Sequence, residues 1–232
     1  MIDHDVIYRE EAARYDRLVA REDQAGNLLK AVRAVMPDLE AKDAADIGAG
    51  TGRLTSLLAP HVRSIRATDA SEAMLRLAAE RLRASGAANW TVAPGANDRL
   101  PLADRSADLL TAGWTICYSA SSSASGWRDN LRAIMAEIDR VLRPGGAAIV
   151  FENFGTGSAE PNPPEFLTAY YAELQNRYGY KHVWIRTDYR FETNEEAVAL
   201  TDFFFGGELS QALAETGATE LPECTGVWWK HV

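Results

Sequence analysis

The chain has few of the features that mark secreted or membrane proteins. Only two of its 232 residues are cysteines, Cys117 and Cys224, which is too few for a disulfide framework. No apolar run approaches the ~20 residues that a membrane-spanning helix needs. The N-terminal stretch is too polar for a secretory signal. These absences predict a cytoplasmic protein without a membrane partner.

Positive charge is also scarce. Acidic residues outnumber lysine and arginine by 33 to 24, which gives a net charge of −9 at pH 7. Proteins that bind nucleic acid usually gather basic residues against the phosphates, and the sequence has no such cluster. Three of the four histidines, His61, His182 and His231, do not have the spacing of metal ligands. We therefore expect neither a nucleic-acid partner nor a metal ion.

What the chain does have is three glycines at alternate positions, Gly48, Gly50 and Gly52. They follow a short apolar segment that ends at Ile47 and precede a helix-like run that begins at Arg53. Glycine is needed where the backbone turns with positive φ or approaches a ligand closely. A strand–turn–helix unit also aims free backbone N–H groups at a bound molecule. The run predicts a loop that binds a nucleotide-containing cofactor.

The spacing and charge of this loop indicate which cofactor it binds. A dinucleotide-binding loop reads G-x-G-x-x-G/A, but Arg53 stands at the position of the last small residue. The carboxylate of Asp46, two residues before the first glycine, would repel a pyrophosphate and attract a cation. S-adenosylmethionine carries a sulfonium and an ammonium group and no phosphate, so it suits this loop better than a dinucleotide does.

In this region the sequence resembles the class I S-adenosylmethionine-dependent methyltransferases. The resemblance is to the branch that methylates small molecules, which includes the ubiquinone and menaquinone C-methyltransferases. The family's D-x-G-x-G-x-G loop corresponds to residues 46–52, and its D-x-S-x-x-M-L run to residues 69–75. Its turn before the fifth strand corresponds to residues 141–146. Several separated matches in register make the resemblance specific.

The resemblance implies which residues bind the cofactor. Asp69 would accept hydrogen bonds from the ribose hydroxyls, although a role in capping the next helix is open. Met74 would flank the adenine with its neighbour Ala70, or be a core residue. Family members usually carry an acid where Gly95 stands, so the adenine amino group is left to the residues that follow. The expected cofactor-binding residues are Asp46, Gly48, Ala49, Gly50, Gly52, Asp69, Ala70, Met74, Ala96, Asn97 and Gly113.

Catalytic residues are harder to assign. Methyl transfer is an in-line displacement with a neutral leaving group, so the enzyme mainly orients and desolvates, and orientation alone supplies ~7–11 kcal/mol. A general base is needed only if the acceptor carries a proton when it attacks. Trp114 and Tyr118 would either line an acceptor pocket or pack under a loop. The candidates for catalysis are Tyr15, Trp114 and Glu152, followed by Asn153, Tyr8 and His4.

Alternating strand-like and helix-like segments predict an α/β fold. We expect a doubly wound, seven-stranded, mostly parallel sheet with helices on both faces, and the family adds a C-terminal antiparallel hairpin. The predicted single domain has a helical N-terminal cover (1–42), a cofactor-binding core (43–153) and an acceptor-side region (154–232). Expected strands are 44–47, 64–69, 90–93, 107–112, 147–152, 181–191 and 226–232. Expected helices are 53–59, 71–85, 127–142, 165–178, 193–205 and 208–216.

Together these observations predict S-adenosylmethionine-dependent methyl transfer to nitrogen, oxygen or carbon of a small molecule. A DNA substrate is disfavoured because residues 113–118 lack the Asn/Asp-Pro-Pro-Tyr type of segment. Two alternatives stay open, a cofactor-binding module without catalysis and a nicotinamide-dependent oxidoreductase. A second copy of the chain is open as a partner. The serine-rich segment 119–125 is either a lid or an uninvolved surface loop.

Overall fold

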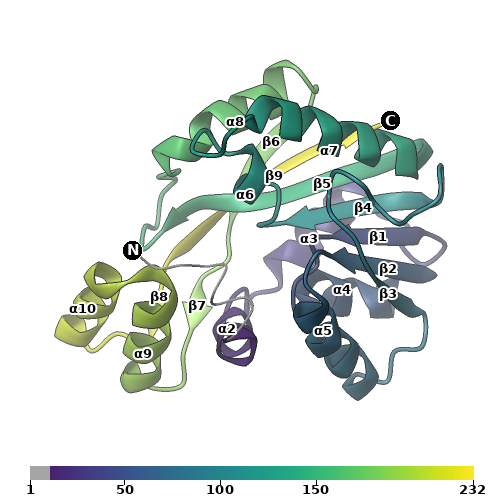
Figure 1. Cartoon of the computed structure of the whole chain (residues 1–232). Coiled ribbons are helices and arrows are strands. Elements are labelled where there is room, and N and C mark those ends of the chain that lie inside the picture. The colour runs from purple at the N-terminus through teal and green to yellow at the C-terminus, as the bar shows by residue number, and fades with distance from the viewer. Residues whose placement is uncertain (1–10) are drawn as a thin grey trace.

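A seven-stranded sheet forms the centre of the computed structural model, which describes residues 11–232 (Figure 1). The strand order is β3-β2-β1-β4-β5-β9-β6; β9 runs antiparallel to both of its neighbours, and all other neighbouring strands are parallel. The predicted fold class is confirmed, including the final antiparallel pair. The strands are β1 (Asp43–Ile47), β2 (Ser64–Asp69), β3 (Trp90–Pro94), β4 (Ala107–Gly113), β5 (Leu142–Thr156), β6 (Lys181–Arg186) and β9 (Glu223–His231).

Helices cover both faces of this sheet because its central strands bury side chains on both sides. In β1, Ala45 and Ile47 pack on one face while Ala44 packs on the other. On the first face lie α6 (Cys117–Ala120), α7 (Trp127–Val141) and α8 (Glu165–Asn176). The second face is covered by α3 (Asn27–Val35), α4 (Arg53–Leu58) with the short helix η1 (Ala59–His61), and α5 (Glu72–Ala84).

A small lobe is inserted between β6 and β9. We name residues 187–222 the cap lobe; it holds β7 (Tyr189–Arg190), α9 (Asn194–Phe205), α10 (Gly207–Thr216) and β8 (Glu220–Leu221). The strands β7 and β8 form a separate two-stranded sheet. The lobe has its own apolar core, which also takes in Leu18 of α2 (Ala12–Val19). Figure 1 shows the lobe and α2 side by side below the main sheet.

The single strand expected over 181–191 is wrong. β6 ends at Arg186, and the next two residues bond to Glu223 at the start of β9 before the chain leaves the main sheet. Thr187 N–H donates to Glu223 O at 2.9 Å, and the Asp188 carboxylate accepts from Glu223 N–H at 2.9 Å. After these bonds the chain enters the cap lobe. The strand-like sequence pattern of 181–191 therefore spans two strands, β6 in the main sheet and β7 in the small sheet.

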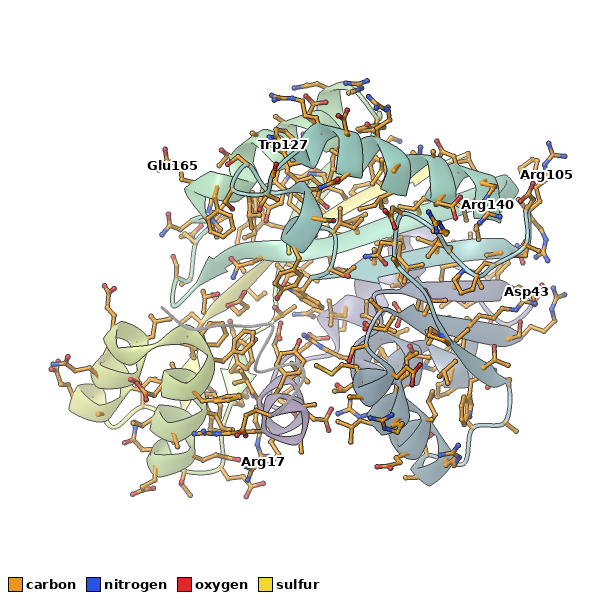
Figure 2. All side chains as sticks on the ribbon, in the orientation of Figure 1. Arg17, Asp43, Arg105, Trp127, Arg140 and Glu165 are labelled. Atoms are coloured by element: carbon orange, nitrogen blue, oxygen red, sulfur yellow. The ribbon has the colours of Figure 1, made fainter. Side chains whose placement is uncertain are left out.

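The two ends of the main sheet differ. At the amino ends of the strands, Asp43 pairs with Arg63 and Arg143, and Figure 2 shows it far from α2. The carboxyl ends of β1, β2, β4 and β5 face α2 and the cap lobe. Open α/β sheets bind ligands at this second end. Within residues 11–232, no helix is both long and apolar enough to span a membrane.

Candidate functional site

A cavity with a volume of about 700 Å³ lies at the carboxyl ends of the strands. We name it the loop cavity because the glycine loop between β1 and α4 forms its floor. Every expected cofactor-binding residue lines it except Gly52. Gly52 lies behind the loop, where a Cβ atom would come within 2.9 Å of the Ala78 Cβ. Gly52 therefore lets α4 approach α5 closely and does not face the cavity.

Asp46 ends β1 as a buried carboxylate in the wall of the loop cavity. Its two oxygens accept hydrogen bonds from the Thr55 hydroxyl at 2.5 Å and the Thr111 hydroxyl at 2.9 Å. Burial raises its pKa to about 6, against the opposing effect of these two hydroxyls. At neutral pH the group is therefore mostly a carboxylate, and it favours a cationic ligand over an anionic one.

Asp69 is fixed by the backbone on both sides. One carboxylate oxygen accepts from Gly50 N–H and the other from Ser71 N–H, each at 2.8 Å. The side chain thus joins the glycine loop to the start of α5, where Ser71 is the N-cap residue. Burial raises its pKa, and the two N–H groups oppose that shift. Each oxygen keeps a second acceptor position, so a rigid carboxylate lines the cavity where β2 ends.

The third part of the loop cavity follows β3. Gly95 packs so closely on Pro101 that a Cβ atom would lie 2.3 Å from the proline Cδ, which explains why an acid is not accommodated there. The side-chain N–H of Asn97 donates to the Thr115 hydroxyl at 2.9 Å. The side-chain carbonyl oxygen of Asn97 takes no part in that bond. Asp98 also lines the cavity and is an additional candidate for reading a base.

The lining of the loop cavity fits the cofactor expected from the sequence. Gly50 has φ +56°, and a Cβ atom built on it would meet no atom within 4 Å. The open space over this glycine is where a ligand can touch the backbone. Among the described lining residues are three carboxyl groups, of which Asp46 and Asp69 are held by hydrogen bonds, and one guanidinium, Arg53, which is already paired with Glu22. A cation that carries a ribose suits these groups, whereas a pyrophosphate would meet two negative charges.

A second cavity of about 390 Å³ adjoins the first. We name it the cap cavity because Tyr189, Phe204 and Phe205 of the cap lobe form one wall. The two cavities share five lining residues, Tyr15, Val19, Arg53, Trp114 and Tyr118. These residues form a common wall, so the two cavities lie side by side.

Trp114 forms much of the common wall in an unusual backbone conformation. Its φ is +50°, which is rare for a bulky residue. The Trp114 N–H donates to Phe151 O at 2.7 Å, and the ring stacks on Phe151 with centroids 6.2 Å apart. The Arg53 guanidinium lies over the indole at 4.3 Å. Trp114 packs on β5 and also lines both cavities. The roles that the sequence offered as alternatives, packing and lining a pocket, therefore occur together.

Charged groups in the cap cavity are incompletely paired. Arg53 binds Glu22 at 2.6 Å, and Glu152 and Glu223 lie on β5 and β9. Each of these side chains has one buried polar atom without a hydrogen-bond partner among the described residues. Those atoms are Glu22 Oε1, Arg53 Nη2, Glu152 Oε2 and Glu223 Oε2. Buried polar groups normally find partners, so such a concentration indicates a site that a ligand completes.

Glu152 is the candidate catalytic residue with the clearest geometry. Its carboxylate is fully buried, and Oε1 accepts from Cys117 N–H at 3.1 Å and the Tyr170 hydroxyl at 3.2 Å. Burial raises its pKa to about 7, against the opposing effect of these bonds. A carboxylate with a pKa near 7 and one oxygen without a partner can accept a proton at physiological pH.

The other candidates divide between the cavity walls and the part of the chain outside the description. Tyr15 lines both cavities, and burial raises its pKa to about 12, so its hydroxyl stays protonated. Asn153 lines the cap cavity. Tyr8 and His4 lie outside the described residues. No group of three or more His, Cys, Asp or Glu within 11–232 is arranged to hold a metal ion.

The serine-rich segment forms part of a cavity wall. Ser121 and Ser123 line the cap cavity, and Ser122 N–H donates to Phe166 O at 2.9 Å. The segment is thus tied to the first turn of α8. Sequence reasoning missed Glu22 and Glu223 altogether, because they are single acids far apart in the chain and only the cap lobe brings them together.

The central part of the chain is similar to known methyltransferases. A family model described as a methyltransferase domain matches residues 45–150. The chain is 34% identical over 147 residues to a malonyl-[acyl-carrier protein] O-methyltransferase of Methylococcus capsulatus, covering 62% of this chain and 48% of that protein. It is 32% identical over 107 residues to a ubiquinone/menaquinone biosynthesis C-methyltransferase of Rubrivivax gelatinosus, covering 46% and 38%. The chain spans about half the length of the curated relatives it matches.

Solved structures share the fold. A methyltransferase from Aquifex aeolicus, described as SAM dependent, superposes with a TM-score of 0.57 over 99% of this chain and 94% of that one, at 16% identity. The family match covers the glycine loop, Asp69 and the segment after β3. Glu22, Glu152 and Glu223 lie outside it. The family match therefore covers most of the loop-cavity lining and leaves out the three acids of the cap cavity.

Proposed function

We propose that the chain is a class I S-adenosylmethionine-dependent methyltransferase, as its match to a methyltransferase domain over residues 45–150 supports, and that it transfers a methyl group to a small acceptor in the cap cavity. The observation that carries this proposal is the pair of adjoining cavities. One is lined by the residues that suit the cofactor, and the other holds an acid with a pKa of about 7. Methyl transfer requires the two bound molecules to lie next to each other, and adjoining cavities would allow this.

The loop cavity would hold the cofactor through groups that are already fixed. The glycine loop and Asp46 would surround its methionine part, and Asp69 would accept hydrogen bonds from the ribose hydroxyls. Ala70 and Met74 would flank the adenine, with Ala96 and Asn97 beside it. S-adenosylmethionine supplies a methyl group on a positively charged sulfur, which is displaced as a neutral thioether.

The remaining residues would orient the acceptor and exclude water. Tyr15, Trp114 and Tyr118 form aromatic surface at the junction, where an acceptor can be held flat or enclosed. The cap lobe closes the cavity from the other side with Phe204 and Phe205. Enclosure of this kind strengthens electrostatic interactions and keeps the reacting groups in a productive arrangement.

Calorimetry and a transfer assay test the proposal. S-adenosylhomocysteine should bind the protein, whereas NADH should give no heat. The protein should then move a labelled methyl group from S-adenosylmethionine to at least one small acceptor. The acceptors tested should include amines, phenols, carboxylates and a malonyl thioester, since several relatives are named for that last group.

Two results would favour the alternatives. Binding of NADH without binding of S-adenosylhomocysteine would support an oxidoreductase. Binding of S-adenosylhomocysteine without transfer to any acceptor class would support a cofactor-binding module without catalysis. A homodimer and a cytoplasmic location stay predictions from the sequence, and sedimentation and fractionation of the full chain test them.

A further inference from the structure

The cap cavity has more acidic than basic side chains. Its described lining residues include three carboxyl groups, Glu22, Glu152 and Glu223, and one guanidinium, Arg53. Arg53 is already bound to Glu22 at 2.6 Å. The exposed fractions of the three acids are 7%, 0% and 2%. Water therefore does little to screen them, and the ligand that fills the cavity decides how their charge is balanced.

The unpartnered oxygens narrow the chemistry of that ligand. Glu22, Glu152 and Glu223 each present a buried oxygen that lacks a hydrogen-bond donor among the described residues. A carboxylate ligand would bring more acceptors and more negative charge, so it would leave these oxygens unpaired. A hydroxyl supplies one donor. An ammonium group supplies up to three donors and the opposite charge.

The aromatic walls point in the same direction. Tyr15, Trp114, Tyr189, Phe204 and Phe205 surround the cavity together with the acids. Aromatic faces attract cations, and the attraction grows where water is excluded. Burial and the nearby charge of Glu22 hold the pKa of Glu223 well above its usual range. A cation beside Glu223 would allow it to ionise.

We propose, on the premise of the methyl transfer proposed above, that the acceptor is a small molecule with a basic nitrogen. Glu22 and Glu223 hold its protonated form, and the Oε2 atom of Glu152 takes up the proton that must leave. The substrate class is therefore amines, and carboxylates are excluded from the cap cavity.

The proposed step balances as follows. The protonated amine first gives one proton to Glu152 Oε2, because only an unprotonated nitrogen has the lone pair that forms the bond to the methyl carbon. The carbon–sulfur bond breaks as the new bond forms, and its electron pair stays on the sulfur. The methylated nitrogen is then positively charged and remains beside Glu22 and Glu223. The products are a protonated methylated amine, a protonated Glu152 and a neutral thioether.

Binding of three matched probes tests the charge preference. The protein is first saturated with S-adenosylhomocysteine and then titrated with 2-phenylethylamine, 2-phenylethanol or 3-phenylpropanoate in a calorimeter. The ammonium of the first probe makes charge-assisted hydrogen bonds that the alcohol cannot make. We expect the amine to bind at least about 10-fold more tightly than the alcohol, and the carboxylate to give no measurable binding.

A pair of variants locates the preference. Glu223→Gln should reduce the advantage of the amine over the alcohol by about 10-fold or more. Glu220→Gln is the matched control, because Glu220 is exposed on β8, pairs with Arg190 and does not line the cavity. It should leave the preference unchanged. Thermal unfolding of both variants checks that they fold, and the three-probe comparison on the parent protein does not depend on either.

Glu152→Gln separates proton transfer from binding. If Glu152 accepts the proton, kcat for methyl transfer to the amine acceptor should fall by about 100-fold or more. The affinity for 2-phenylethylamine should change far less. A merely structural role would lower both together.

The outcomes distinguish this inference from the proposed function. If S-adenosylhomocysteine fails to bind, both proposals are overturned. If it binds and 3-phenylpropanoate binds as tightly as the amine, or the alcohol equals the amine, only the amine inference is overturned. An unchanged probe preference in a folded Glu223→Gln variant would likewise refute the assigned role of Glu223.

Discussion

The two ends of the central sheet treat buried charge in opposite ways. At the amino end, Asp43 bonds to Arg63 at 2.5 Å and to Arg143 at 2.9 Å, and Asp108 bonds to Arg143 at 2.8 Å. At the carboxyl end, Glu152 and Glu223 each retain an oxygen without a partner among the described residues. One end has its charges matched within the chain, and the other leaves them for a ligand.

The pKa values record the same difference. The Arg63 guanidinium beside Asp43 holds the pKa of that carboxyl well below its usual range. Burial without a cationic partner raises the pKa of Glu152 to about 7. An ionised carboxyl group thus stabilises the fold at the amino end of the sheet. At the carboxyl end, ionisation of a carboxyl group lowers the stability of the fold, at a residue that lines the candidate site. The predictions below test this contrast, from the largest expected effect to the smallest.

The largest effect is expected from Gly50→Val. A branched side chain at φ +56° would project into the open part of the loop cavity and block contact with the backbone. Affinity for S-adenosylhomocysteine, measured by calorimetry, should fall by about 100-fold or more. Gly145→Val is the matched control at the amino end, since Gly145 has φ +81° and is equally open. It should lower the melting temperature without changing the affinity, and equal affinities of the two variants would contradict the assignment of the loop.

Asp69→Ala should weaken S-adenosylhomocysteine binding by about 10- to 100-fold. It removes an acceptor of charge-assisted hydrogen bonds, each worth about 1.5–3 kcal/mol. It also releases Gly50 N–H and Ser71 N–H, so we expect some loss of stability as well. Asp108→Ala is the amino-end control, because Asp108 accepts from Asp43 N–H and Arg143. If both variants lose stability and neither loses affinity, Asp69 is structural only.

Glu152→Gln should raise the free energy of unfolding of the empty protein at pH 8, by about 1–2 kcal/mol. The native pKa of about 7 lies above the unfolded value of about 4.3, so ionisation at high pH destabilises the fold by roughly 3 kcal/mol. Part of the gain is lost because the new amide N–H group is buried without a partner. The advantage should shrink as pH falls from 7 towards 4, in chemical denaturation followed at several pH values. A variant that is less stable than the parent at pH 8 would contradict this.

Asp43→Asn should have a smaller effect of the opposite sign. It lowers the free energy of unfolding at pH 7 by about 1 kcal/mol, since Arg63 and Arg143 are partly exposed and solvent screens the pairs. The contribution of Asp43 is present above its unfolded pKa of about 3.9 and is lost as pH falls through the lower native value. The difference between variant and parent should therefore narrow below pH 4, and a constant difference would show that charge is not its cause.

Local signals were enough to predict the loop-cavity half of the molecule. Three features there depend only on neighbouring residues: the glycine run, the strand that ends at Asp69 and the N-cap at Ser71. Each can therefore be recognised from a short stretch of sequence. The segment 64–69 is the strand that the structure has. The departure at Gly95 was also visible, although its cause, contact with Pro101, was not.

The cap cavity could not be predicted in the same way. Glu22, Glu152 and Glu223 lie far apart in the sequence and carry no shared motif. Their meeting depends on the break between β6 and β7, which Asp188 fixes by bonding to Arg186 and to the backbone of Glu223. Such long-range bonds leave no period in the local pattern. The strand expected over 181–191 therefore continued through a boundary that only the folded chain defines.

The position of β9 also affects how the protein assembles. This strand lies between β5 and β6, yet it is made after both and after the whole cap lobe. A chain growing from its N-terminus can form the glycine loop and pair β1 with β2 and β4 early, but β5 and β6 stay unconnected until residues 223–231 arrive. Pairing over such sequence separations is slow and leaves strand edges exposed in the meantime. The acceptor side of the sheet is therefore completed last, by the final strand of the chain.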